Sequence, residues 1–146
     1  SMNKLNGLNL KTIEFLHNTG AVDGKVAFCG SRGWTDIEAT SFDEQDEKIY
    51  KRELNRLQLS IDDMEKKAKG ETIEKRIALL HYPPFNAKGD PNDFAELMVS
   101  AGIDICIYGH LHSFGHKFIV EGEINGIEYY CVSSDYIDFE LRKIEV

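Results

Sequence analysis

The stretch from residue 75 to residue 108 constrains the fold of this chain more than any other, because it reads as strand, helix and strand. Residues 75–80 and 103–108 are largely apolar runs of the kind that parallel sheets bury. Between them, residues 91–101 predict a helix that Asn92 can cap and Gly102 can end. Such a crossover makes the two strands parallel and is nearly always right-handed. The chain is therefore predicted to be an α/β protein.

The amino-terminal half adds a predicted hairpin and one long helix. Residues 12–15 and 25–29 are expected to be strands that a turn at residues 18–20 connects. Residues 43–69 carry apolar side chains at steps of three and four, which predicts an amphipathic helix with a narrow apolar stripe toward the sheet. We find no composition shift that would divide the chain, so a single domain is expected.

The carboxyl-terminal part predicts antiparallel strands. Asn125-Gly126 is the strongest short hairpin signal available, here between expected strands at residues 117–124 and 127–133. Residues 138–146 suggest one more strand. These strands are expected to form a second sheet packed against the first, which gives a layered α/β sandwich.

Composition narrows the class of protein. The 146 residues have a net charge of −8, which disfavours nucleic acid or an anionic membrane as a partner unless metal ions supply positive charge. Cys29, Cys106 and Cys131 lie in or at the end of apolar runs without Cys-x-x-Cys spacing, so buried reduced thiols are expected. Neither a membrane-spanning run nor a signal peptide is evident, and a cytoplasmic location is expected.

Histidines follow both strands of the strand–helix–strand unit. His81 comes directly after the first strand, and His110 and His112 lie in the Gly-His-Leu-His segment after the second. In extended backbone, imidazoles one residue apart project from the same side, and carboxyl ends of parallel strands meet at one sheet edge. A single histidine at a strand end is more often an ordinary loop residue, but three such histidines favour metal binding. We therefore predict that they ligate metal.

The loop at residues 30–34 is a second candidate region. Arg32 is expected to meet an anionic group of a substrate and Trp34 to shape the wall of the site. A surface loop whose Trp34 packs on the core is an equally supported interpretation. His116, close to the doublet, is a candidate for contact with substrate or for support of a ligand. His17 is interpreted as a hairpin residue.

Two segments resemble a known family. Residues 80–84, Leu-His-Tyr-Pro-Pro, and residues 108–112, Tyr-Gly-His-Leu-His, resemble the carboxyl-terminal motifs of the calcineurin-like metallophosphoesterases. Residues 29–34 and 132–136 look like the bacterial Ser/Thr-phosphatase-like branch of that family. The resemblance spans most of this chain but only the later half of such a protein.

The resemblance implies a fold and an activity. The family's fold is a two-sheet sandwich flanked by helices, and its activity is hydrolysis of phosphate esters at two divalent metal ions, manganese, iron or zinc. By this similarity, His81 and His110 would bind one ion and His112 the other. Phosphoprotein, nucleotide, phospholipid and small phosphate esters all remain open as the substrate.

The family's amino-terminal motifs have no counterpart ahead of His81. The Asp-x-His, the bridging aspartate and the Gly-Asn-His-Asp or Glu segment belong to that missing half, which is where catalytic residues are expected. We expect the chain to be a truncated or cleaved product or a mis-called start, with partial metal binding or none and little activity alone. Its exposed sheet is expected to be covered by the missing half or by self-association.

Two other functions fit the sequence. The three histidines would suffice for a mononuclear zinc enzyme with an open site. Alternatively, the chain is a non-catalytic module that binds a partner through its sheet and the loop carrying Arg32 and Trp34, with structural or vestigial histidines.

Overall fold

The computed structural model of the chain describes Ile13 and residues 15–146. Six strands form one mixed sheet in the order β1-β2-β3-β4-β6-β5. The strands are β1 (Ala21–Asp23), β2 (Val26–Ser31), β3 (Lys75–Leu80), β4 (Ile105–Tyr108), β5 (Gly122–Ile124) and β6 (Ile127–Cys131). The helices are α2 (Glu44–Ala68), α3 (Asp93–Ser100) and the short 3-10 helix η1 (Ser113–Phe118). The α/β class is confirmed.

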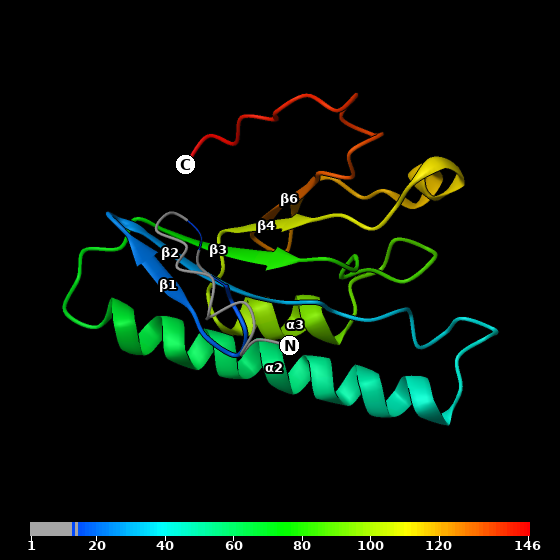
Figure 1. Ribbon diagram of the computed structural model, residues 1–146, viewed down its shortest axis with the longest axis horizontal. Coiled ribbons are helices and arrows are strands. Elements are labelled where there is room, and N and C mark those ends of the chain that lie inside the picture. Colours follow the sequence, from blue (N-terminus) through cyan, green and yellow to red (C-terminus); the bar gives the residue numbers. More distant parts are fainter. Residues whose placement is uncertain (1–12, 14) are drawn as a thin grey trace.

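The predicted strand–helix–strand unit is present. β3 and β4 pair in parallel, and α3 connects them. The Asn92 side chain caps α3 by accepting a hydrogen bond from the Phe94 amide, and Gly102 follows the helix with φ +65°. This unit carries the ends of both strands to one edge of the sheet, where their loops lie (Figure 1).

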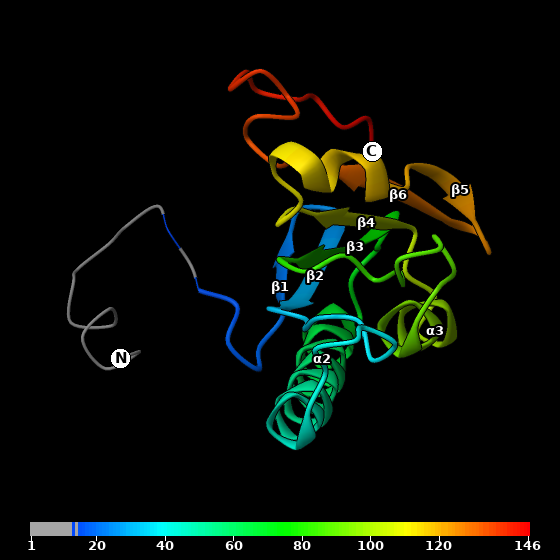
Figure 2. The same cartoon turned by 90° about the vertical axis from the view of Figure 1, so that its right-hand side faces the viewer.

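The long helix α2 begins where its sequence predicts. Asp43 and Asp46 form a reciprocal capping box at its first turn. Leu57 and Met64 are fully buried in the core between the helix and the sheet. Both α2 and α3 lie on the same side of the sheet (Figure 2). Among the described residues, no helix is both long and apolar enough to cross a membrane.

The amino-terminal hairpin differs from the prediction. Of the first expected strand, residues 12 and 14 lie outside the described residues. The observed hairpin pairs β1 with β2 around Gly24 and Lys25, so the turn expected at residues 18–20 was wrong. Gly24 has a φ of +56°, which glycine adopts at little cost and which makes this two-residue turn possible.

The carboxyl-terminal part joins the first sheet. The Asn125-Gly126 turn is confirmed, with φ of +52° and +83°, and connects β5 to β6. However, β6 pairs in parallel with β4, so no second sheet forms among the described strands. Ile127 and Tyr129 are buried in the same core that the helices cover, which explains the pairing.

Two other strand predictions in this part were wrong. The expected strand at residues 117–124 contains the end of η1 and is a strand only over β5. Residues 138–146 form turns and irregular backbone. Arg142 lies over the Tyr130 ring, 4.8 Å from its centroid, and pairs with Glu121, so side-chain contacts hold this segment on the sheet.

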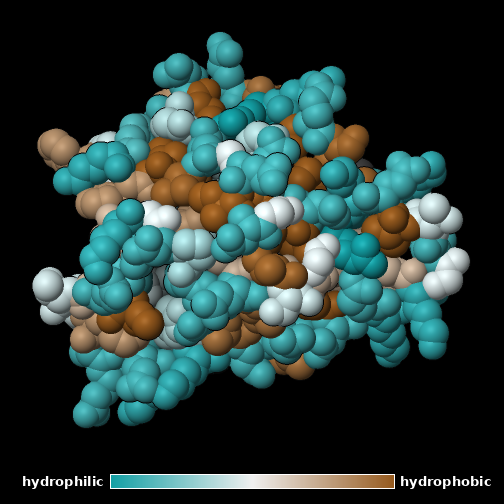
Figure 3. Space-filling model, turned by 180° about the vertical axis from the view of Figure 1, so that it is seen from behind, coloured by the Kyte–Doolittle hydropathy of each residue, from teal (hydrophilic) through white to brown (hydrophobic). Residues whose placement is uncertain are grey.

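The helices cover one face of the sheet and leave apolar side chains on the other. Leu79 lies in the central strand β3, between Gly30 of β2 and Ile107 of β4, and is 38% exposed. The predicted self-association stays a prediction, and the helix-free face around Leu79 is where it would occur. Apolar patches also lie between hydrophilic side chains on the surface seen from behind (Figure 3).

We expect Leu79→Lys to weaken self-association of the chain by about tenfold, because a buried leucine contributes roughly 1.5–3 kcal/mol to an interface. Sedimentation velocity over a concentration series measures the change. Leu59→Lys is the matched control, since Leu59 is 43% exposed on α2, away from the open face. A single monomeric species of the unchanged chain at all concentrations would contradict the prediction.

Candidate functional site

A cavity of about 450 Å³ opens at the carboxyl ends of β2 and β3 and beside the segment after β4. It lies at the sheet edge that the strand–helix–strand unit predicts. His81, His110 and His112 all line it. Serines complete much of its polar wall: Ser31, Ser133 and Ser134.

Two of the histidines are in direct contact. Nδ1 of His110 lies 3.1 Å from Nε2 of His81, and the ring centroids are 4.9 Å apart. Backbone hydrogen bonds fix the two segments, because the Gly109 amide donates to the His81 carbonyl at 3.2 Å. The His81 amide in turn donates to the Arg32 carbonyl, which joins the ends of β2, β3 and β4 into one unit.

The backbone at His110 is a tight turn and not the extended segment expected. Its φ is +73°, and the Leu111 amide donates to the Gly109 carbonyl at 2.9 Å across it. This is the pattern of the rare positive-φ γ-turn. A non-glycine residue in this region costs roughly 1–3 kcal/mol, and such strain is concentrated at functional sites. The turn aims His110 at His81 and separates it from His112.

His112 has a different partner. Its Nδ1 lies 2.6 Å from Oδ1 of Asp135, and Oδ2 of the same carboxylate accepts a hydrogen bond from the Ser113 amide. Nε2 of His116 lies 3.2 Å from the second oxygen of the same carboxylate. The Ser113 amide and then the two imidazoles hold the pKa of Asp135 well below its ordinary value of 3.8. With Nδ1 turned to a carboxylate, Nε2 of His112 is the nitrogen free for a ligand.

The protonation states of the paired histidines suit metal binding. Partial burial lowers the pKa of His81 below the ordinary 6.5, and the charges of His112 and Arg32 lower it further. Burial likewise lowers the pKa of His110, aided by the charges of His81 and His112. Both imidazoles are therefore neutral at pH 7, the form that offers a lone pair to a cation.

His81 and His110 have a nitrogen spacing close to that of two ligands on one metal ion, whereas the three histidines together do not form one ligand group. Two nitrogens on one tetrahedral zinc ion lie roughly 3.3 Å apart, because each bond is about 2.0–2.1 Å long. The pair at 3.1 Å is close to this spacing, and in the structure the same two nitrogens are within hydrogen-bond distance of each other. The described part of the chain contains no group of three or more His, Cys, Asp or Glu side chains placed to hold a metal ion. It therefore does not form the site that a mononuclear three-histidine enzyme requires.

The side chains of Arg32 and Trp34, in the loop after β2, contact other residues of the same chain. Arg32 lies 3.2 Å from Oε1 of Glu53, which is only 1% exposed and is shared with two further arginines. The guanidinium also stacks 4.2 Å from the centroid of Trp34. The Trp34 indole donates to Asp46 at 3.0 Å and packs 5.3 Å from the Tyr82 ring. Arg32 therefore meets an internal carboxylate, and Trp34 lies between helix α2 and the loop after β3.

Sequence reasoning missed three residues of this region. Asp135 lies 23 positions after His112, and only its place in the Ser-Ser-Asp-Tyr segment marked it. Glu53 looked like one more charge on the solvated face of α2. Tyr82, stacked 3.9 Å from His110, was noted only as part of a motif. The three cysteines are buried and free, as expected, and burial raises the pKa of Cys29 to about 12.

No family model, no curated protein and no solved structure matches the chain.

Proposed function

We propose that this chain is the histidine-bearing part of a cytoplasmic, metal-dependent phosphoesterase of the calcineurin-like type. The observation that carries the proposal is the His81–His110 pair, whose facing nitrogens lie 3.1 Å apart at the carboxyl edge of a parallel sheet. The strained turn at His110 supports it, because a positive φ at a non-glycine residue is found most often at functional sites. The two sequence motifs that end in these histidines agree with it.

The side chains of this chain would have separate tasks in such a site. His81 and His110 offer neutral nitrogens to one divalent ion, manganese, iron or zinc, and His112 offers Nε2 toward a second. Asp135 fixes the orientation of the His112 ring. Divalent ions in such a centre activate water and stabilise the phosphoryl oxygens. The charge of Arg32 reaches His81, and its guanidinium would have to leave Glu53 to bind the phosphate ester directly.

The remaining ligands are proposed to come from segments outside this sequence. A bridging carboxylate is what holds two cations close together, and histidines alone do not supply one. The same segments would bring the second sheet of a sandwich, and the open face around Leu79 is where that sheet would pack. The chain by itself is therefore expected to have little activity.

The test uses the protein that carries this sequence together with the segment encoded directly upstream of Ser1. That segment is expected to contain Asp-x-His and Gly-Asn-His motifs. The protein should release phosphate from p-nitrophenyl phosphate with added Mn²⁺ and lose this activity when a chelator removes the metal. Hydrolysis that persists unchanged in excess chelator, or none with any of the three metals, would overturn the proposal.

Asp135→Asn is expected to weaken metal affinity about tenfold to a hundredfold, because the amide no longer fixes the His112 tautomer. The substitution keeps the size of the side chain, so the free energy of unfolding should change little by comparison. Isothermal titration with Mn²⁺ measures the affinity. Asp138→Asn is the matched control from the same loop, because Asp138 makes no hydrogen bond or ion pair with a histidine in the described part of the chain. Equal loss in both variants would contradict the role given to Asp135.

A further inference from the structure

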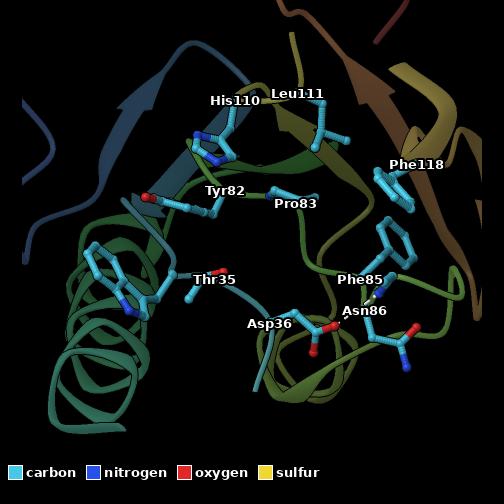
Figure 4. Close-up of a pocket in the computed structure, with 11 residues that line it drawn as sticks. Thr35, Asp36, Tyr82, Pro83, Phe85, Asn86, His110, Leu111 and Phe118 are labelled. Atoms are coloured by element: carbon cyan, nitrogen blue, oxygen red, sulfur yellow. Dashed lines mark hydrogen bonds between the residues drawn. The ribbon is translucent and has the colours of Figure 1, made fainter. Parts of the chain in front are cut away.

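A second cavity, of about 200 Å³, lies directly beside the histidine cavity. His110 lines both, so a molecule held at the paired histidines can extend into this second space. In Figure 4, His110 and Tyr82 lie at one end of the pocket, and Asp36 and Phe85 lie at the other. We name this space the aromatic pocket and define it by Trp34, Tyr82, Phe85, Leu111 and Phe118.

The walls of the aromatic pocket are ring faces and edges. Tyr82 stacks on His110 with centroids 3.9 Å apart and planes at 32°, and it also contacts Trp34. Phe118 closes the opposite side and is 42% exposed, so part of its ring is accessible to an occupant of the pocket. Four aromatic side chains around so small a space favour a planar, apolar occupant.

The carboxylate oxygens of Asp36, at the far end of the pocket, already accept backbone hydrogen bonds. One carboxylate oxygen of Asp36 accepts from the Ala87 amide at 3.0 Å, and the other accepts from the Glu38 amide at 2.9 Å. These hydrogen bonds hold the carboxylate against the backbone of residues 38 and 87. Because this carboxylate lines the far end of the pocket, it disfavours an anionic group there, and a neutral ring fits.

We propose that the aromatic pocket seats a single aromatic ring in the organic part of the phosphate ester, close to the phosphate. The proposal rests on the proposed function for the position of the phosphate, while the ring itself is recognised by this pocket alone. The size supports one ring, because a cavity of roughly 150 Å³ is known to hold benzene, and 200 Å³ leaves room for its linking atom. A fused two-ring group would extend beyond the rings of the pocket into its open side.

The fluorescence of Trp34 reports ligand binding in the pocket directly, because Trp34 is the only tryptophan of the chain and lines the pocket. The titrants are benzyl phosphate and cyclohexylmethyl phosphate, which carry the same charge and similar leaving groups but differ in aromaticity. Tryptophan fluorescence of the metal-free chain is expected to show benzyl phosphate binding about threefold to tenfold more tightly. 2-Naphthylmethyl phosphate is expected to bind no better than benzyl phosphate.

The variants are a matched pair from η1. Phe118→Ala removes one wall of the pocket and is expected to lower the affinity for benzyl phosphate about three- to tenfold. Phe114→Ala removes an equal side chain that is 92% exposed and does not line the pocket, so its affinity should equal that of the unchanged chain. Circular dichroism checks that both variants remain folded, as the exposure of both side chains predicts.

The outcomes separate this inference from the proposed function. Equal affinities for the two esters, or equal losses in the two variants, would overturn the aromatic pocket even if metal-dependent hydrolysis is observed. Ring-selective binding that Phe118→Ala abolishes would support the pocket even if no phosphate is released, and only the hydrolytic function would then fail.

Discussion

Replacement of His110 by alanine is expected to lower metal-dependent phosphate-ester hydrolysis at least about a hundredfold, since loss of a residue that merely supports a metal ligand already costs roughly ten- to a hundredfold. In the proposed site, the facing nitrogens of His81 and His110, which lie 3.1 Å apart, would both bind one ion. Without His110, the described residues would offer that ion a single imidazole. Affinity for the metal and turnover should therefore fall together.

The measurement is the initial rate of p-nitrophenyl phosphate hydrolysis at saturating Mn²⁺, paired with a calorimetric titration of the metal. Alanine has a Cβ atom like histidine, so the strain of the positive φ remains, and any change in the free energy of unfolding reflects the lost contacts of the partly buried ring. His17→Ala is the control, because this exposed histidine does not line the histidine cavity. Unchanged turnover after His110→Ala would remove the basis of the proposed function.

Phe94→Ala is expected to lower the free energy of unfolding by about 3–5 kcal/mol, the largest stability effect we predict. Phe94 is only 1% exposed and lies in the core on α3, with its ring edge-to-face on Tyr50 of α2 at a centroid distance of 5.1 Å. Its removal leaves a cavity between the two helices and the sheet, which the surrounding side chains fill only in part. The free energy of unfolding of a small domain is roughly 5–15 kcal/mol, so the variant should be close to unfolding.

Urea unfolding followed by circular dichroism measures this change, and the midpoint should fall while the slope stays constant. Val99→Ala on the same helix is the control, because Val99 is 41% exposed and the loss should remain within about 0.5 kcal/mol. Equal destabilisation by the two substitutions would show that α3 does not anchor the core as its burial indicates.

Elements that are stabilised by residues close together in the chain could be predicted from the sequence alone. Residues 75–108 predicted strand, helix and strand because apolar periodicity, the Asn92 cap and Gly102 act within a few residues of each other. The Asn125-Gly126 turn follows from the positive φ that both residues tolerate. The placement of His81 and His110 at one sheet edge follows from the same local elements, because a crossover connection leaves few alternatives.

Features that depend on residues far apart in the chain could not be predicted and became evident only in the folded structure. β6 pairs with β4 in the first sheet because its apolar side chains share the core under the helices, and alternation alone does not identify a pairing partner. The contact of Asp135 with His112 joins residues 23 positions apart through a loop without local signal. Likewise, the turn that directs His110 at His81 is a strained conformation, and strained backbone persists only where the surrounding fold enforces it.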